Sequence, residues 1–471
     1  MPKACNITVR DEVYCTVTGL EPADHAYLDK KYALMVEGAF YMPLYKLGRW
    51  DGRVRFFDKA GKVYQRLLPE ICVIIENWGY EINLNDHRLP VNPIVGRVDK
   101  DWFLRKRPEM KLKVELRPYQ VDAVNACLDN QSGFVEAATG SGKTWMVAAL
   151  TDILATNDIR TIVIVPSDDL VTQTAATLRL GLLDVGIYSG STKDIYHTVV
   201  VGTWQALQNN PGLMNEFQCL IVDEAHGAKA KVVGDLINAH GKNIAYRFGF
   251  TGTMPKPEID RLTLRGSIGD VLFEISASTL MALGYLAQLE IEPVEINEDV
   301  EEDFTDYSAE KTFLAKNPKR LDFLADLIIA KALEYGNTFV LVNSIKQGKE
   351  LQKRIKDSVF LHGADESEVR SEWYSLFDTR DDLIVIATFG IASTGISIDR
   401  IFCEIMIDAG KSFIRAIQSI GRGLRKSGDK DRVHMVDVHS KLKWSMKHYR
   451  ERVKYYKAAK YPVLKPVKYQ L

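Results

Sequence analysis

The sequence predicts an α/β protein with two parallel-sheet domains, preceded by a small α+β domain and followed by a basic helical tail. Short apolar runs rich in Val and Ile alternate with longer mixed stretches in two separate parts of the chain. Such runs are typical of strands covered on both faces, and the stretches between them are long enough for crossover helices. The 471 residues, 46% of them hydrophobic, suffice for roughly three domains.

The expected elements divide the chain into four parts. In the N-terminal part we expect a hairpin of 54–57 and 63–68 and a short helix over 69–79, with prolines marking a linker after it. The expected domains are 1–110, 111–287, 288–440 and the tail 441–471. The expected strands of the two sheets are 133–137, 161–166, 198–202, 220–223 and 246–251, and then 338–343, 359–363, 383–388, 404–408 and 433–438.

Composition excludes several classes of protein. No window approaches the roughly 18 unbroken apolar residues of a membrane helix, and the N-terminus lacks the apolar core of a secretory signal. The six cysteines are scattered without a Cys-x-x-Cys pair, which argues against a disulfide framework or a zinc knuckle. We therefore expect a cytoplasmic protein with no membrane partner.

The net charge of −1 conceals an asymmetry. The last 61 residues carry 17 Lys+Arg and 4 Asp+Glu, so this end has a net charge of +13 and the rest carries −14. Residues 290–310 hold ten acids and no base, and we expect them to be a solvated surface segment near the domain junction. A local basic surface is compatible with a nucleic-acid partner despite the neutral total.

The sharpest motif is a glycine-rich loop between an expected strand and an expected helix. The sequence Ala-Ala-Thr-Gly-Ser-Gly-Lys-Thr occupies 137–144. Glycines let backbone N–H groups close around phosphates, and the helix N-terminus adds its dipole. Lys143 would reach the β- and γ-phosphates of ATP, and the Thr144 hydroxyl would hold Mg²⁺. The loop residues expected to bind the nucleotide are Ala138, Thr139, Gly140, Ser141, Gly142, Lys143 and Thr144.

Two further motifs supply the groups that phosphate chemistry needs. Asp223 and Glu224 follow an apolar run, so Asp223 can bind Mg²⁺ and Glu224 can activate water. Arg422 and Arg425 lie three residues apart, on one face of an expected helix, and can neutralise a γ-phosphate in the transition state.

In this order, and with Gln418 opening the third motif, these segments resemble a superfamily 2 helicase. The resemblance implies two RecA-like lobes with ATP between them, and it implies catalytic roles for Lys143, Glu224, Gln418, Arg422 and Arg425. It also assigns Gln120 of Arg-Pro-Tyr-Gln to the adenine base and Gly395 to the nucleotide. The residues it assigns to the nucleic-acid backbone are Pro166, Gln173, Thr203, Gln205 and Thr388.

One departure narrows the resemblance. Many superfamily members have Gly-x-Asp where this chain has Gly395-Ile396-Ser397, so a contact made by that Asp is in doubt here. The segment 393–397 and the N-terminal segment 48–55 instead resemble phage UvsW-type branch-migration helicases. This implies a branched DNA substrate, such as forks, displacement loops and four-way junctions, in the cytoplasm of an infected host.

Basic and aromatic residues are interleaved at both ends of the chain. Near the N-terminus, Arg49, Trp50, Arg53 and Arg55 are candidates for DNA contact, because cations bind phosphates and aromatic rings stack on exposed bases. The alternative is that the aromatics form a local core and the arginines are solvated. In the tail, the aromatics are expected mainly to dock a helix over 441–460 on the second lobe.

We therefore expect an ATP- and Mg²⁺-dependent DNA helicase or translocase. The motifs alone do not separate DNA from RNA, since backbone contacts dominate in both, so an RNA helicase of the Asp-Glu-Ala-His type is an alternative. A non-catalytic clamp switched by ATP and a translocase subunit of a larger complex are two others. Oligomeric state and protein partners are left open, with a monomer possible.

Overall fold

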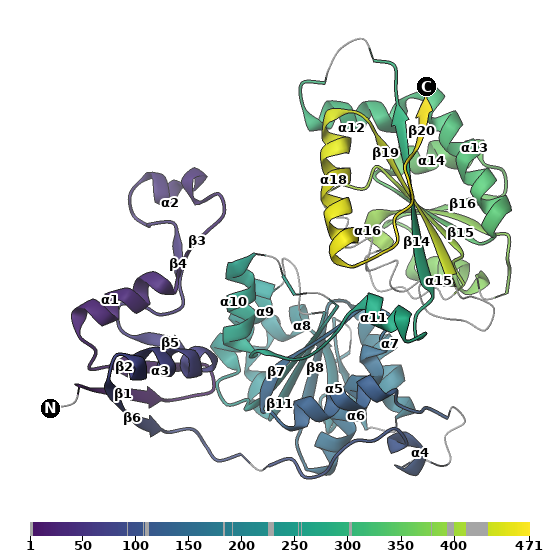
Figure 1. The fold of residues 1–471 in the computed structure, drawn as a ribbon. Helices are drawn as coiled ribbons and strands as arrows, with labels where there is room; N and C mark the ends of the chain where they lie inside the picture. Colours follow the sequence, from purple (N-terminus) through teal and green to yellow (C-terminus); the bar gives the residue numbers. More distant parts are fainter. Residues whose placement is uncertain are drawn as a thin grey trace. The chain divides into compact units, whose positions relative to one another are not determined.

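The computed structural model divides the chain into two compact units. The first contains Met1–Ala137 and Gly142–Glu274, and the second contains Ala138–Ser141 and Ile275–Leu471 (Figure 1). No helix among the described residues is long and apolar enough to cross a membrane. The structure describes residues 3–91, 93–106, 108, 113–181, 184–190, 192–224, 230–252, 254–255, 257–300, 304–377, 379–392, 400–410 and 432–471.

The first unit begins with a four-stranded sheet in the order β5-β2-β1-β6. Alternate residues of β1, such as Cys5 and Ile7, point into a core that Ile71 and Ile75 of α3 complete. This alternation is the period-two pattern of a sheet with one buried face. The bounds are β1 Lys3–Val9, β2 Tyr14–Thr18, α1 Pro22–Lys31, β5 Lys62–Tyr64, α3 Leu68–Asn77 and β6 Tyr80–Asp86.

The expected N-terminal hairpin is wrong in its pairing, although its turn forms. The Asp58 carboxylate accepts hydrogen bonds from the backbone N–H groups of Ala60 and Lys62, and Gly61 has a φ of 72°. The preceding strand β4 (Arg53–Arg55) nevertheless pairs with β3 (Ala33–Met35), and β5 pairs with β2. A single Phe57–Val63 bridge joins the two sides of the turn. Phe56 and Phe57 are both buried, so the chain turns inward where the hairpin was expected to continue.

The rest of the first unit is built on a seven-stranded sheet in the order β13-β7-β12-β11-β8-β10-β9. All five expected strands form, and β9 and β13 are additions. Parallel pairs join β7 through β12, β11, β8 and β10 to β9. The bounds are β7 Ser132–Ala137, β8 Thr161–Val165, β9 Val185–Tyr188, β10 Val199–Thr203, β11 Cys219–Asp223, β12 Tyr246–Thr251 and β13 Val271–Ile275.

Helices surround this sheet, and the central strands are buried along their length, as their continuous Val and Ile content requires. The core includes Phe134, Ile162, Val200 and Leu220. The helices are α4 Trp102–Lys106, α5 Pro118–Leu128, α6 Lys143–Thr156, α7 Asp168–Leu180, α8 Trp204–Asn209, α9 Ala230–His240 and α10 Glu258–Ser267.

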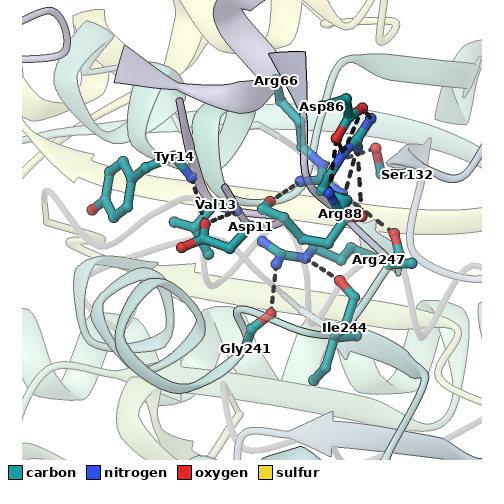
Figure 2. A network of polar contacts seen from close by, with 12 residues as sticks. Asp11, Val13, Tyr14, Arg66, Asp86, Arg88, Ser132, Gly241, Ile244 and Arg247 are labelled. Atoms are coloured by element: carbon teal, nitrogen blue, oxygen red, sulfur yellow. Dashed lines mark hydrogen bonds and ion pairs between the residues drawn. The ribbon is translucent and has the colours of Figure 1, made fainter. Parts of the chain in front are cut away.

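A buried arginine, Arg66, joins the four-stranded sheet to the amino edge of the seven-stranded one (Figure 2). The Arg66 guanidinium donates to the Ser132 hydroxyl at 2.9 Å and to the backbone carbonyls of Glu12 and Ala245. Burial lowers the pKa of Arg66 to about 10, so the side chain remains charged at neutral pH. The Glu12 carboxylate lies 3.6 Å from the Arg66 guanidinium and 3.2 Å from that of Arg88. Arg66 therefore has a structural role in joining the two sheets.

The second unit holds another seven-stranded sheet, in the order β16-β17-β15-β18-β19-β14-β20, and all six pairings are parallel. The strands are β14 Gln288–Asn297, β15 Thr338–Val342, β16 Ser358–Leu361, β17 Ile384–Thr388, β18 Cys403–Ile407, β19 Arg432–Ser440 and β20 Val467–Gln470. The helices are α11 Ala277–Ala282, α12 Tyr307–Lys316, α13 Pro318–Tyr335, α14 Ile345–Arg354, α15 Ser367–Leu376, α16 Phe389–Ala392 and α18 Lys443–Ala458. Two parallel sheets with an N-terminal α+β part and a helical tail confirm the predicted fold class.

The acidic segment is not the solvated surface that its composition suggested. Its first half is β14, which lies between β19 and β20. Apolar residues alternate with the acids and enter the core, while Glu292 binds Lys331 at 2.7 Å and His434 at 2.6 Å. Glu298 is 5% exposed and binds the Arg320 guanidinium at 2.6 Å. The large number of charged residues hid the period-two pattern of a strand in this segment. Residues 301–303 of the segment lie outside the described part.

The basic tail packs on the second sheet, as expected, and then adds a strand that was not expected. The buried Arg452 of α18 binds Asp437 at 2.7 Å, and the Tyr456 hydroxyl donates to the same carboxylate. The Glu310 carboxylate accepts hydrogen bonds from two N–H groups of the first turn of α18. After Pro466, β20 pairs with β14 at the sheet edge. The tail is thus an integral part of the second unit.

Candidate active site

The phosphate-loop motif connects β7 to α6 with the backbone that such a loop requires. Gly140 and Gly142 have φ angles of 84° and 80°, in the left-handed region that residues with a Cβ rarely adopt. A Cβ on Gly142 would lie 2.5 Å from the Gln120 amide nitrogen. Both glycines are therefore needed for the loop to close at the N-terminus of the 14-residue helix α6. That helix end offers N–H groups and a positive dipole to an anion.

Lys143 is the first residue of α6 and is 8% exposed. Its ammonium donates to the Ala137 carbonyl at 3.3 Å and lies 3.5 Å from a Glu224 carboxylate oxygen. The structure therefore brings together two residues 81 positions apart that were assigned to one site. A cation held by these two long contacts can turn towards a phosphate without losing a strong ion pair.

Asp223 and Glu224 stand at the carboxyl end of β11, beside the carboxyl end of β12. Glu224 has a φ of 54°, which is uncommon for a residue with a side chain. Its N–H donates to the Phe250 carbonyl at 2.8 Å and lies 3.0 Å from the Asp223 carboxylate. Strained backbone of this kind persists where its surroundings fix it.

Gln120 lies beside the loop, as its assignment to the nucleotide requires. It is 4% exposed, and its side-chain oxygen accepts a hydrogen bond from the Arg117 N–H at 2.8 Å. This capping contact fixes the side chain at the start of α5, with its amide nitrogen towards Gly142. Thr144 and the loop residues Ala138–Gly140 are partly exposed, whereas Ser141 is buried.

Glu136 is a site residue that the motif search missed. It precedes Ala137 in β7, pairs in register with Thr251, and accepts a hydrogen bond from the Met254 N–H at 3.2 Å. Burial raises the pKa of its carboxyl, and the neighbouring charge of Glu274 adds to the effect. The signal in the sequence was one acid inside an otherwise apolar strand. Glu136 links the phosphate loop to the Thr-Gly-Thr segment, of which Thr253 lies outside the described residues.

The residues assigned to the nucleic-acid backbone follow strands at their carboxyl ends. Pro166 follows β8, and Gln173 is exposed on α7. Thr203 is 4% exposed and its hydroxyl caps α8 by accepting from the Ala206 N–H, while Gln205 is exposed. In the second unit, Thr388 ends β17 and is partly exposed.

The four N-terminal candidates for DNA contact differ in how many hydrogen bonds and ion pairs they already form within the protein. Arg55 forms ion pairs with Asp29 at 2.8 Å and Asp51 at 2.6 Å. The Trp50 indole N–H donates to the Arg53 carbonyl, and the Arg53 guanidinium donates to a backbone carbonyl of β3. Arg49 is exposed and has no ion pair among the residues that the structure describes. Trp50 and Arg55 thus support the local fold.

Four assigned residues cannot be placed. Gly395, Gln418, Arg422 and Arg425 lie outside the described residues. Within the described part of the chain, no group of three or more His, Cys, Asp or Glu side chains could hold a metal ion by itself. A cation at Asp223 would therefore need further oxygen ligands, which a hydroxyl and nucleotide phosphates can provide.

Two protein families match the chain in the order that the motifs predict. The family described as "Type III restriction enzyme, res subunit" matches residues 113–256, and the family described as "Helicase conserved C-terminal domain" matches residues 319–427. The first match contains the phosphate loop, Asp223 and Glu224, and the second contains the arginine motif.

Similar proteins agree with these families. The chain is 27% identical to the ATP-dependent DNA helicase uvsW of Enterobacteria phage T4 over 431 residues, which covers 85% of this chain and 83% of that protein. It is 29% identical over 191 residues to the DNA 3'-5' translocase XPB2 of Sulfurisphaera tokodaii, covering 40% of this chain and 42% of the relative. The structure of S. cerevisiae Dbp5 bound to RNA and ADP BeF3 shares the fold with a TM-score of 0.55 and 17% identity, over 80% of this chain and 94% of that one. Together the two family matches and the relative matched along most of its length show an ATP-hydrolysing helicase that resembles superfamily 2 helicases and the phage UvsW protein.

Proposed function

We propose that this enzyme is an ATP-dependent DNA helicase or translocase that remodels forks, displacement loops and four-way junctions by branch migration. The observation that carries the proposal is the meeting of Lys143 and Glu224 at 3.5 Å beside a glycine loop that opens a long helix. The T4 relative, a DNA helicase by name and matched over most of both chains, supports DNA as the substrate. Its phage source also supports action in the cytoplasm of an infected host.

The residues around the loop fit a nucleoside triphosphate with Mg²⁺. Thr144 and Asp223 would hold the ion with oxygen ligands, which Mg²⁺ prefers, and the phosphates would supply others. The ion would neutralise charge on the phosphates. Lys143 would exchange its contact with Glu224 for the β- and γ-phosphates, which would leave the Glu224 carboxylate able to orient and deprotonate water. Gln120 would hydrogen-bond the adenine base.

The rest of the assignment comes from sequence motifs. Arg422 and Arg425, with Gln418 before them, would stabilise charge on the γ-phosphate during transfer, and Gly395 would contact the nucleotide. From the sequence we also propose domain limits of 1–110, 111–287 and 288–440, with 441–471 as a basic tail that packs on the second lobe. The exposed Gln173 and Gln205 would contact the DNA backbone together with Pro166, Thr203 and Thr388.

ATP hydrolysis with matched nucleic acids tests this proposal. Steady-state rates are measured at one salt concentration with a four-way junction, a fork, a linear duplex of equal length and an RNA duplex. We expect the two branched DNAs to stimulate hydrolysis most and to be unwound or migrated. The Lys143→Ala variant controls for contaminating ATPase. Stronger stimulation by RNA would replace the proposal with an RNA helicase, and ATP binding without hydrolysis on any of the nucleic acids would favour the non-catalytic clamp.

A further inference from the structure

An exposed apolar surface lies on the segment 33–55, which we call the arm. The arm contains β3, the 3₁₀ turn Ala39–Tyr41, the short helix α2 (Pro43–Lys46) and β4. It extends from the four-stranded sheet with α2 at its far end (Figure 1). Its side chains include several of the most exposed large apolar residues of the described chain: Phe40 at 57%, Tyr41 at 82%, Leu44 at 55% and Leu47 at 65%.

The exposure does not come from a loosely packed segment. Ala39 is fully buried, and the Phe40 and Tyr45 rings meet edge to face at 5.1 Å. Gly52 has a φ of 76°, and a Cβ there would lie 2.8 Å from the Met35 sulfur. Backbone hydrogen bonds join Val36 to Gly52 and Arg49 to Leu44. A small core of its own therefore holds the arm in one shape and presents the apolar side chains outward.

The charges of the arm identify its ligand. Arg55 is already paired with two carboxylates, but Lys46 and Arg49 are exposed beside the apolar residues and form no ion pair with any described residue. Protein–protein interfaces are depleted in Lys, whereas sites for single-stranded nucleic acid combine aromatic rings with free cations. An ordered apolar surface of this kind on a monomer usually marks a binding site.

We propose that the arm binds unpaired bases at the branch point of the DNA, with Phe40 and Tyr41 stacking on the bases and Lys46 and Arg49 contacting the adjoining phosphates. This inference rests on the proposed function and adds the residues that recognise the branch. It moves the base contact from Trp50, whose indole N–H is bound within the arm, to side chains that motif matching did not select.

The full chain carrying Phe40→Ala and Tyr41→Ala tests the proposal. Affinity is measured by fluorescence anisotropy for a fork whose branch contains unpaired 2-aminopurine and for a fully paired linear duplex. We expect at least tenfold weaker binding of the fork, less than twofold change for the duplex, and loss of the 2-aminopurine quenching that the wild type produces. The Tyr41→Phe variant keeps an aromatic ring and should retain both affinity and quenching.

Tyr27→Ala is the matched control, because Tyr27 is a 54% exposed aromatic of α1 in the same N-terminal part, outside the arm. Equal losses on fork and duplex, or unchanged fork binding in the double variant, would overturn the proposal. A wild-type dimer that the double variant converts to a monomer would assign the surface to self-association and also overturn it. The proposed function fails separately, if branched DNA does not stimulate the wild-type ATPase at all.

Discussion

The two edges of the first seven-stranded sheet use charge in opposite ways. At the amino edge, the fully buried Arg247 donates to the carbonyls of Ile244, Ser267 and Gly241 at 2.6–2.9 Å. At the carboxyl edge, Lys143 has two contacts of 3.3 Å and 3.5 Å. A charged side chain held by several short hydrogen bonds fixes one structure, whereas a charged side chain held by long contacts can exchange partners. The comparison therefore separates a buried arginine that holds the lobe together from the residues that would act on a nucleotide.

The largest expected effect is at the carboxyl edge and concerns activity. Replacing Glu224 with Gln removes the carboxylate that would activate water, so we expect ATP turnover to fall about 10³-fold, or about 4 kcal/mol in the barrier. ATP binding, measured with a fluorescent nucleotide, should persist. The urea midpoint should change little, because the Lys143 contact is long. Steady-state turnover like that of the wild type would remove Glu224 from the mechanism.

The next effect is at the amino edge and concerns stability. Replacing Arg247 with Met leaves three buried carbonyls without their donors, so we expect the free energy of unfolding to fall by about 3 kcal/mol. Equilibrium urea denaturation measures it. ATPase per folded molecule should remain, and Arg247→Lys should recover part of the loss. If turnover fell while stability did not, the contrast between the two edges would be broken.

A smaller effect tests the cost of a charge at the carboxyl edge. Burial raises the pKa of Glu136, so its ionised carboxylate destabilises the fold. This cost is absent below the pKa that the carboxyl has in the unfolded chain, and stability is lost as pH rises through the pKa in the folded protein. At pH 7, Glu136→Gln should therefore stabilise the protein, by at most about 1 kcal/mol because the side chain is partly exposed. The Gln oxygen can still accept from the Met254 N–H.

The gain from Glu136→Gln should shrink towards zero near pH 4, as urea midpoints measured across pH would show. A gain that grew on acidification would contradict the assigned direction of the pKa shift.

The smallest effect is expected for a surface pair in the same unit. Arg97 and Asp129 form an exposed ion pair on the first unit. Since water and salt screen such pairs, Arg97→Ala should leave the urea midpoint and the ATPase unchanged within error. A clear loss of stability there would show that charge count, and not burial, governs the difference between the two edges.

Much of the fold was predictable because its signals are local. The continuous Val and Ile runs marked ten of the fourteen strands of the two parallel sheets, and the loop Gly140-Ser141-Gly142 needs only its own backbone to be recognised. Glu136 and the strand β14 were missed, because a charge inside an apolar run and a run crowded with charges both weaken a local pattern. The roles of the individual site residues stay predictions.

The sequence by itself determined the two parallel sheets, the phosphate loop and the position of Asp223 and Glu224 at a strand end. Only the tertiary structure decided that β4 pairs with β3, that β20 completes the second sheet, and that Arg66 is buried against Ser132. Strand partners and buried ion contacts join residues far apart in the chain, and their energies depend on burial and packing that no local window contains. The same reason explains why Phe40 and Tyr41, apolar in sequence, became candidates for DNA contact only when their exposure was known.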